Sequence, residues 1–170
     1  IDYDINITLS YSLGKYMIYE DAKSGLETAI NKNIAICPAN DFSIKDQIEA
    51  KKNLDVIKMV KLALDEFKIL SYFQPIINNK TQQVEKYESL VRLIDENGEV
   101  ISPFEFLSVS KRGSYYNKIT SRVLENSFQI LQSIKTELSI NLSTLDIEKD
   151  ETRELIYYLL ENNEKDRHRL

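Results

Sequence analysis

The mixture of apolar and polar positions along residues 84–94 indicates a β-strand. Because successive side chains of a strand point to opposite faces, Glu88, Leu90 and Arg92 share one face at steps of about 6.6 Å. In such a row the carboxylate can bind a metal, the aliphatic side chain can pack against a flat base, and the guanidinium group can neutralise a phosphate. The alternative is a half-exposed edge strand with an incidental ion pair, and both interpretations stay open on this stretch alone.

Upstream, the hydrophobic pattern predicts a small strand–helix–strand block within residues 1–40. Its expected elements are a strand at 5–13 ended by Gly14, a helix at 19–32, and a strand at 34–37 stopped by Pro38. A block of roughly 40 residues cannot bury both of its faces alone. Residues 41–53 are polar and charged, and we expect them to form a linker.

Residues 54–170 form a second predicted block of helices and strands. Its expected elements are a helix at 54–68, strands at 70–77 and 84–94, a helix at 103–110 begun by Ser102-Pro103, a helix at 116–135, a strand at 137–142 and a last helix capped by Asp150. This order predicts an α/β fold whose later strands are parallel. Three strands are too few to close a barrel, and residues 167–170 lie where another strand could begin.

The strand at 137–142 carries a second chemical signal. Its apolar residues point to one face and its polar residues, including Asn141, point to the other. An asparagine near the carboxyl end of a barrel strand lies where barrel active sites are built. Its carbonyl oxygen is a neutral hard ligand suited to magnesium or manganese. The alternative role for Asn141 is to satisfy backbone groups of the loop that follows.

Composition excludes several classes of protein. The sequence is 42% hydrophobic and 29% charged, as in ordinary globular proteins, and its formal net charge of −5 with no basic run argues against binding a nucleic acid polymer. A single cysteine, Cys37, excludes an intrachain disulfide and a thiolate zinc cluster. No apolar run reaches membrane-spanning length and no signal-peptide layout is present, so we expect no membrane contact from this segment. The expected location is the cytoplasm, including the cytoplasmic part of a membrane-anchored sensor.

Four segments, in order and at plausible spacing, resemble the amino-terminal half of an EAL domain. They are residues 72–76 (Tyr-Phe-Gln-Pro-Ile), 88–92 (Glu-Ser-Leu-Val-Arg), 103–107 (Pro-Phe-Glu-Phe-Leu) and 139–143 (Ser-Ile-Asn-Leu-Ser). EAL domains are cyclic di-GMP phosphodiesterases with a modified TIM-barrel fold whose first strand is antiparallel to the others. The resemblance covers about residues 54–170 and implies a partial barrel of this kind.

The first block is similar to the tail of a GGDEF (diguanylate cyclase) domain. Residues 7–14 would match a late strand of that domain and residues 19–32 its final helix, but its signature loop and nucleotide-binding residues are absent. Tandem GGDEF–EAL proteins join the two domains through a helix placed like residues 54–68. The resemblance therefore implies a GGDEF-like remnant, a linker and a truncated EAL-like domain.

Carried over by position, the EAL resemblance gives each motif residue a role. Glu88 and Asn141 would be ligands of Mg²⁺ or Mn²⁺. Gln74 would contact cyclic di-GMP, Leu90 would pack on a guanine and Arg92 would hold a phosphate oxygen. The signature alanine is replaced at position 89 by a serine, which points away from the ligand face. In the family later glutamates, paired aspartates and a lysine complete the site, so this chain holds no complete catalytic set.

Three functional interpretations follow from the resemblance. The intact parent could hydrolyse cyclic di-GMP to the linear dinucleotide, could bind it as a non-catalytic receptor, or could serve as a scaffold for partner contacts. The presence of Glu88 and Asn141 favours the enzyme, since a pure receptor does not need metal ligands. The 170-residue chain itself is expected to be a piece of a longer protein and to be inactive alone. We expect it to form homo-oligomers, either by pairing its unpaired parallel strand edge or by exchanging elements between copies.

Overall fold

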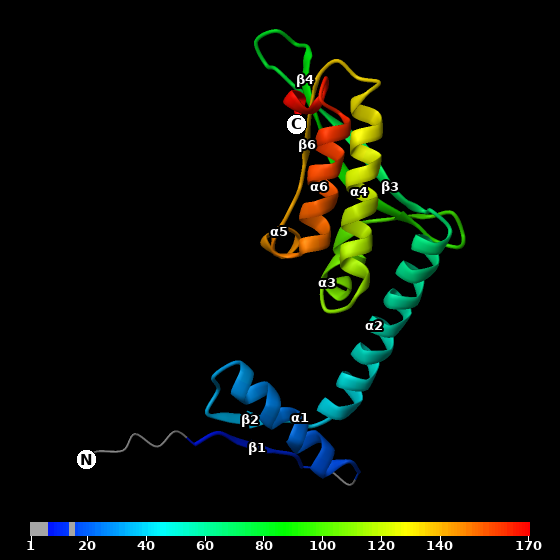
Figure 1. Cartoon of the computed structure of the whole chain (residues 1–170). Coiled ribbons are helices and arrows are strands. Elements are labelled where there is room, and N and C mark those ends of the chain that lie inside the picture. Colours follow the sequence, from blue (N-terminus) through cyan, green and yellow to red (C-terminus); the bar gives the residue numbers. More distant parts are fainter. Residues whose placement is uncertain (1–6, 14–15) are drawn as a thin grey trace, which may run out of the picture. The chain divides into compact units, whose positions relative to one another are not determined.

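The structure is a computed structural model that describes residues 7–13 and 16–170 (Figure 1). The described residues divide into two compact units whose boundary lies between Asp55 and Val56. Helix α2 (Phe42–Asp65) crosses this boundary, so it contributes its first half to one unit and its second half to the other.

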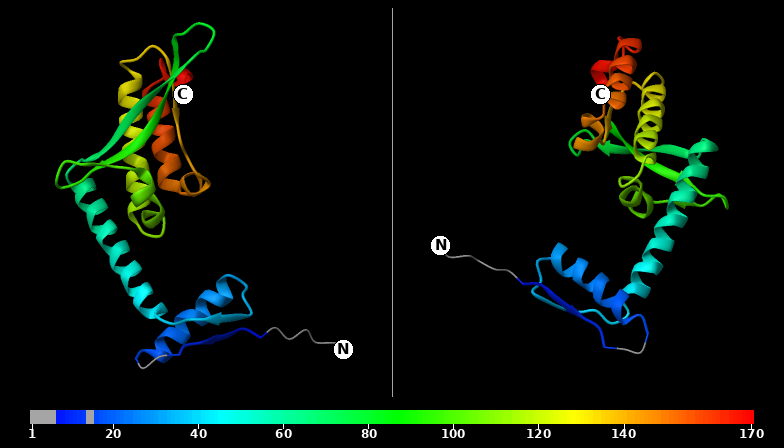
Figure 2. Two further views of the ribbon diagram at one scale, coloured as in Figure 1. Left: turned by 180° about the vertical axis from the view of Figure 1, so that it is seen from behind. Right: turned by 60° about the horizontal axis from the view of Figure 1, so that its bottom comes forward.

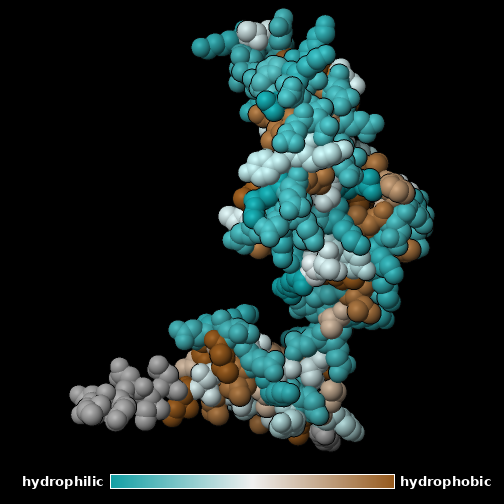
Figure 3. All heavy atoms as spheres, viewed as in Figure 1, coloured by the Kyte–Doolittle hydropathy of each residue, from teal (hydrophilic) through white to brown (hydrophobic). Residues whose placement is uncertain are grey.

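In the first unit, β1 (Leu9–Tyr11) pairs in parallel with β2 (Ile36–Pro38), and α1 (Ile18–Asn31) connects them. This is the expected strand–helix–strand unit. Strand β1 is shorter than the strand predicted at residues 5–13. Residues 5 and 6 of that prediction, and Gly14, the residue expected to end the strand, lie outside the described residues. Pro38 is the last residue of β2 rather than a residue that stops it. Figure 3 shows hydrophobic residues on the surface of this unit.

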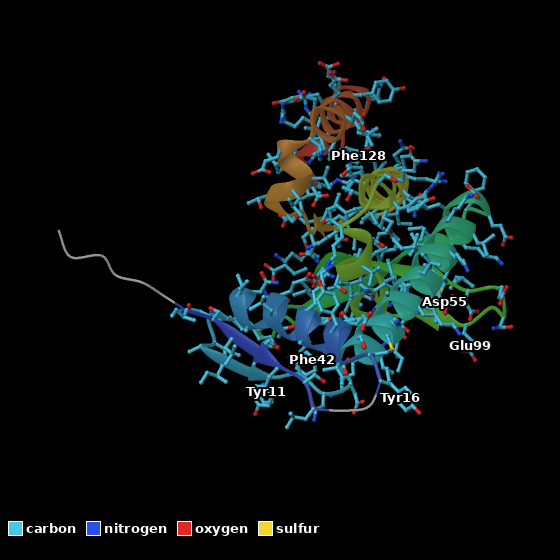
Figure 4. The ribbon with its side chains drawn as sticks, turned by 90° about the horizontal axis from the view of Figure 1, so that it is seen from below. Tyr11, Tyr16, Phe42, Asp55, Glu99 and Phe128 are labelled. Carbon is cyan, nitrogen blue, oxygen red and sulfur yellow. The ribbon has the colours of Figure 1, made fainter. Side chains whose placement is uncertain are left out.

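The predicted linker is helical, which corrects the expected start of the helix at residue 54. Helix α2 begins at Phe42, where its first turn is held by Asp21 of α1 (Figure 4 labels Phe42 and Asp55). The buried Asp21 carboxylate accepts hydrogen bonds from the backbone N–H of Ser43 at 2.8 Å, from the Ser43 hydroxyl at 2.6 Å and from the N–H of Asp41 at 3.1 Å. These hydrogen bonds, above all those from Ser43, hold the pKa of Asp21 below its ordinary value.

The second unit contains the remaining helices and strands (Figures 1 and 2). They are β3 (Ile69–Ile77), β4 (Val84–Ile94), β5 (Val100–Ile101), α3 (Pro103–Ser110), α4 (Tyr115–Leu131), β6 (Glu137–Ile140), α5 (Thr144–Glu148), α6 (Asp150–Asn162) and the 3₁₀-helix η1 (Arg167–Arg169). Strand β3 is antiparallel to β4, and β4 is parallel to β6. The parallel pair agrees with the order of elements in the sequence, and the antiparallel strand before it is what the EAL resemblance implies.

One face of the sheet is closed by helices. Ile69 of β3 and Leu93 of β4 are buried together with residues from three helices, namely Val60 and Ala63 of α2, Phe106 of α3, and Ile119 and Val123 of α4. Burying these apolar side chains supplies the main favourable free energy of the unit. Figures 1 and 2 agree that α4 and α6 lie on one side of β3 and β4. The opposite face of these strands carries the candidate site.

Several boundaries differ from the sequence prediction for identifiable reasons. Residues 167–169 form η1 instead of a new strand, because the Arg169 guanidinium folds back and donates to the carbonyls of Leu131 and Ile134 at the end of α4. Lys149 holds the cap position of α6, so Asp150 is its first helical residue. Helix α5 and the two-residue β5 are too short to be recognised from periodicity. Within residues 7–13 and 16–170, no helix combines the length and the apolarity that crossing a bilayer needs.

Candidate functional site

Three pairs of facing residues define the open face of the β3–β4 ladder. Gln74 lies opposite Glu88, Tyr72 opposite Leu90, and Leu70 opposite Arg92. Residues that face one another on adjacent strands point to the same side of a sheet. The ladder therefore brings Gln74, Leu90 and Arg92, the three predicted ligand-binding residues, onto one surface with Glu88.

Strand β6 adds Asn141 to this surface. Ser139 is in register with Glu88, and Asn141 follows β6 one residue after its end, on the same side as Ser139. The Nδ2 of Asn141 donates a hydrogen bond of 2.6 Å to the Oε1 of Glu88. The two side chains converge on one face, as strand alternation predicts. Asn141 follows the end of β6, but Glu88 lies inside β4 and not at its carboxyl end. Their role as metal ligands stays a prediction.

Arg92 is held in place by its own strand and by an aromatic ring. Its Nη1 donates to the carbonyl of Val91 at 2.8 Å, and its Cζ lies 5.7 Å from the centre of the Tyr72 ring. The Tyr72 side chain is 44% exposed on the open face. Sequence reasoning did not single out Tyr72, although strand alternation places it in phase with Gln74. The open face thus presents a cation beside an aromatic ring.

The residues between the site residues anchor β4 from behind. Ser89, which stands where the family has alanine, is buried, and its Oγ lies 2.8 Å from the Oγ of the buried Ser127 on α4. Leu93 is fully buried in the core. The serine therefore faces away from the ligand surface, as the sequence predicts, and joins the strand to the helix behind it.

The donor set of the open face fits a hard divalent cation. Glu88 supplies a carboxylate, and the Asn141 amide supplies a carbonyl oxygen, which are the ligand types that Mg²⁺ and Mn²⁺ take. Among residues 7–13 and 16–170, however, no group of three or more acidic, histidine or cysteine residues is placed to hold a metal. The described residues thus provide two ligands of suitable chemistry, which is a partial site.

A buried carboxylate that sequence reasoning missed lies behind Asn141. Asp146 of α5 is 1% exposed and accepts four hydrogen bonds from three neighbours, Thr120 and Tyr116 of α4 and Ser143. Burial acts to raise the pKa of Asp146, but these hydrogen bonds outweigh it and hold the pKa below its ordinary value. The usable signal in the sequence was the spacing Ser143-x-x-Asp146, a capping-box pattern.

The EAL-domain family profile matches residues 57–170 of this chain. The match covers more than half of the chain, and the chain belongs to the EAL-domain family. Its structural neighbours have a mixed α/β fold of the TIM-barrel type, and this chain holds a part of that fold.

Known relatives are similar to parts of the chain. The signaling protein YkoW of Bacillus subtilis (strain 168) is 25% identical over 118 residues, which are 64% of this chain and 14% of YkoW. The FimX EAL domain of Pseudomonas aeruginosa, solved bound to c-di-GMP, is 28% identical with a TM-score of 0.56, covering 64% of this chain and 45% of that one. The PaMucR phosphodiesterase, solved as a c-di-GMP complex, shares the fold at 17% identity and a TM-score of 0.58, covering 65% and 47%. The chain therefore spans less than half of these solved chains.

Proposed function

We propose that this chain forms the amino-terminal part of an EAL domain that binds cyclic di-GMP and hydrolyses it to the linear dinucleotide. The observation that carries the proposal is the 2.6 Å contact between Asn141 and Glu88 on the face that also bears Gln74, Leu90 and Arg92. The two residues expected to bind metal therefore lie on the same face as the three expected to bind the dinucleotide. The c-di-GMP complexes of the FimX EAL domain and PaMucR support the choice of ligand.

Each residue of the open face has a chemical role in this proposal. Arg92 would pair with a phosphate oxygen through charge-assisted hydrogen bonds, which are the stronger kind. Leu90 would pack on a guanine, and the adjacent Tyr72 ring offers a second flat surface for the base. The amide of Gln74 can donate to and accept from the dinucleotide.

Glu88 and Asn141 would hold a divalent cation, Mg²⁺ or Mn²⁺, in the intact domain. Bound there, such an ion would supply Lewis-acid polarisation of the phosphodiester and activation of water. The two residues hold each other in place through their hydrogen bond. Because two ligands make only a partial site, we propose that the 170-residue chain alone does not turn over cyclic di-GMP.

The second candidate function is a receptor that binds cyclic di-GMP without cutting it. Arg92, Leu90 and Gln74 would serve a receptor equally well. Glu88 and Asn141 favour hydrolysis, because a receptor gains nothing from a paired carboxylate and amide of metal-ligand chemistry. The two functions differ in whether the intact domain releases the linear dinucleotide.

The remaining proposals concern the setting of the domain. We propose that the first unit is the tail of a GGDEF-like domain, since β1, α1 and β2 form a parallel strand–helix–strand unit. We also propose a cytoplasmic location for the domain, including the cytoplasmic part of a membrane-anchored sensor. Each of these goes beyond the EAL family match of residues 57–170.

Self-association is a further part of the proposal. Among the described strands β3 pairs with β4 alone, so its other edge is unpaired, and exposed Leu70 and Ile77 lie along β3. An unpaired strand edge with apolar side chains favours pairing with another copy. We expect sedimentation velocity to show a concentration-dependent dimer, weakened by Leu70→Lys. A monomer that persists at high concentration would contradict this.

The ligand proposal is tested by titrating the ¹⁵N-labelled 170-residue chain with cyclic di-GMP and following amide shifts. We expect the largest changes at Gln74, Leu90 and Arg92 on the open face and small ones at Ser127 behind the sheet. GMP at the same concentration serves as the control ligand and should shift these signals less. Changes restricted to the helical side, or equal changes with GMP, would contradict the proposed site.

A further inference from the structure

We infer that Asp146 is a positioning residue that fixes Asn141 in the geometry needed to meet Glu88. The inference rests on the proposed function only in taking Asn141 to be a functional ligand. Asp146 lies five residues after Asn141 and contacts neither Asn141 nor Glu88 in any described hydrogen bond. It acts through Ser143 and through the loop that joins β6 to α5.

The Asp146 carboxylate ties this loop to helix α4. Its Oδ2 accepts from the backbone N–H of Ser143 and from the Ser143 hydroxyl, both at 2.7 Å. The same oxygen accepts from the Tyr116 hydroxyl at 2.9 Å, and Oδ1 accepts from the Thr120 hydroxyl at 2.6 Å. One buried carboxylate therefore joins two loop donors to two donors on α4.

Asn141 lies between two fixed points. On its amino-terminal side, Ser139 and Ile140 are paired with Glu88 and Ser89 in the β4–β6 ladder. On its carboxyl-terminal side, Ser143 is held by Asp146. Only Asn141 and Leu142 span the interval, so fixing both ends leaves the Asn141 side chain little freedom to leave Glu88.

A cavity lies next to the loop, so packing contacts are missing on that side. A space of about 150 Å³ is lined by Tyr116 and Thr120 of α4, by Ser89 of β4 and by Asn141 and Leu142 of the loop. Well-packed interiors leave few voids larger than a water molecule. Packing alone therefore does not hold the loop on this side, and the hydrogen bonds of Asp146 supply what the missing contacts would.

The charge of Asp146 is matched to this task. All four described donors point hydrogens at it, and an ionised carboxylate accepts four or more hydrogen bonds while donating none. An asparagine at position 146 would present an NH₂ group to donors on one side, and buried donors would then lose their acceptor. Asp146→Asn is therefore a nearly isosteric change that should release Ser143.

The test uses NMR of the metal-free 170-residue chain, with the Asn141 side-chain amide as the reporter. We expect its two Nδ2 proton signals to be well separated in the wild type, because the amide is held against the Glu88 carboxylate. In Asp146→Asn the two signals should move toward the values of a free amide. Glu105→Gln is the matched control, since Glu105 holds the same position in the capping box of α3, away from the site.

A milder variant keeps the test valid where Asp146→Asn fails to fold. Thr120→Val preserves the shape of the side chain and removes one donor to Asp146 while the carboxylate stays charged. It should shift the Asn141 signals in the same direction by a smaller amount. Unchanged Asn141 signals in both Asp146→Asn and Thr120→Val, with the fold intact, would overturn the inference.

Mn²⁺ binding separates this inference from the proposed function. In the wild type, Mn²⁺ alone should broaden the Asn141 and Glu88 signals, and Asp146→Asn should weaken its affinity by about 10- to 100-fold, as loss of an outer supporting contact does. Glu105→Gln should leave the affinity unchanged. Absence of Mn²⁺ binding in the wild type would count against the metal site and leave the metal-free result to decide the role of Asp146. Wild-type affinity in a folded Asp146→Asn would overturn the inference.

Discussion

The Nδ2 of Asn141 lies 2.6 Å from the Oε1 of Glu88, although 53 positions separate the two residues along the chain. The contact exists because β6 pairs in parallel with β4 and brings Ser139 level with Glu88. Two side chains of metal-ligand chemistry thus meet where the end of β6 lies beside the middle of β4. The helices occupy the other face of the sheet, so this pair stays available to a ligand.

Replacing Arg92 by alanine should weaken binding of cyclic di-GMP by about 10- to 100-fold. A hydrogen bond to a charged group contributes about 1.5–3 kcal/mol, and each 1.4 kcal/mol is about tenfold in affinity. Isothermal titration calorimetry measures the change. Arg122→Ala is the matched control, because Arg122 also lies over an aromatic ring, that of Phe67, but on helix α4. Equal losses in the two variants would show that Arg92 makes no specific phosphate contact.

The hydrogen bond between Ser89 and Ser127 predicts non-additive effects on stability. Either serine replaced alone by alanine leaves a buried hydroxyl without its partner, which costs about 1–3 kcal/mol of unfolding free energy. The double variant removes both hydroxyls and should cost less than the two single changes together. Urea unfolding of the four proteins measures the coupling. Strict additivity would show that the 2.8 Å contact contributes nothing to stability.

Asp146 should make the unfolding free energy of the second unit depend on pH in the acid range. Its pKa is lowered in the folded chain, whereas an unfolded aspartate has a pKa of about 3.9. The carboxylate therefore stabilises the fold fully above the unfolded pKa, and this contribution is lost as the pH falls through the lower folded value. The stability difference between the wild type and Asp146→Asn should be constant from pH 7 to about pH 5 and shrink below about pH 4.

Urea unfolding at a series of pH values measures this difference. Tyr116 is the titratable neighbour of Asp146, and burial raises its pKa above the ordinary value. Its hydroxyl therefore stays protonated across the acid range and does not confound the measurement. A difference that grows toward low pH would contradict the lowered pKa.

The sequence predicted the site strands well because local patterns determine them. Strand β4 has the predicted bounds, because polar turn residues stand directly before and after residues 84–94. Helix α3 also has its predicted bounds, since the serine cap and the following proline mark its start. That Glu88 and Asn141 share a face could be expected from strand phase together with the EAL resemblance.

The missed features depend on contacts between distant residues. The polar first half of α2 has no apolar stripe, and it is capped by Asp21, some twenty positions upstream. Asp146 finds its partners Tyr116 and Thr120 on another helix, 30 and 26 positions away. No local periodicity encodes such pairs. The Ser143-x-x-Asp146 spacing marks a helix start, but only the fold shows that this carboxylate also binds α4.

The most direct test of the proposed function is hydrolysis of cyclic di-GMP by the complete EAL domain that contains this chain, compared between the wild type and the Glu88→Gln variant. The wild type should release the linear dinucleotide with Mg²⁺ or Mn²⁺ present. Glu88→Gln should lose this activity and keep its fold by circular dichroism, because an amide of nearly the same size is a weaker ligand for a divalent ion. Glu85→Gln, on the same strand, should retain activity. Near-normal turnover by Glu88→Gln, or no turnover by the wild type, would contradict the account.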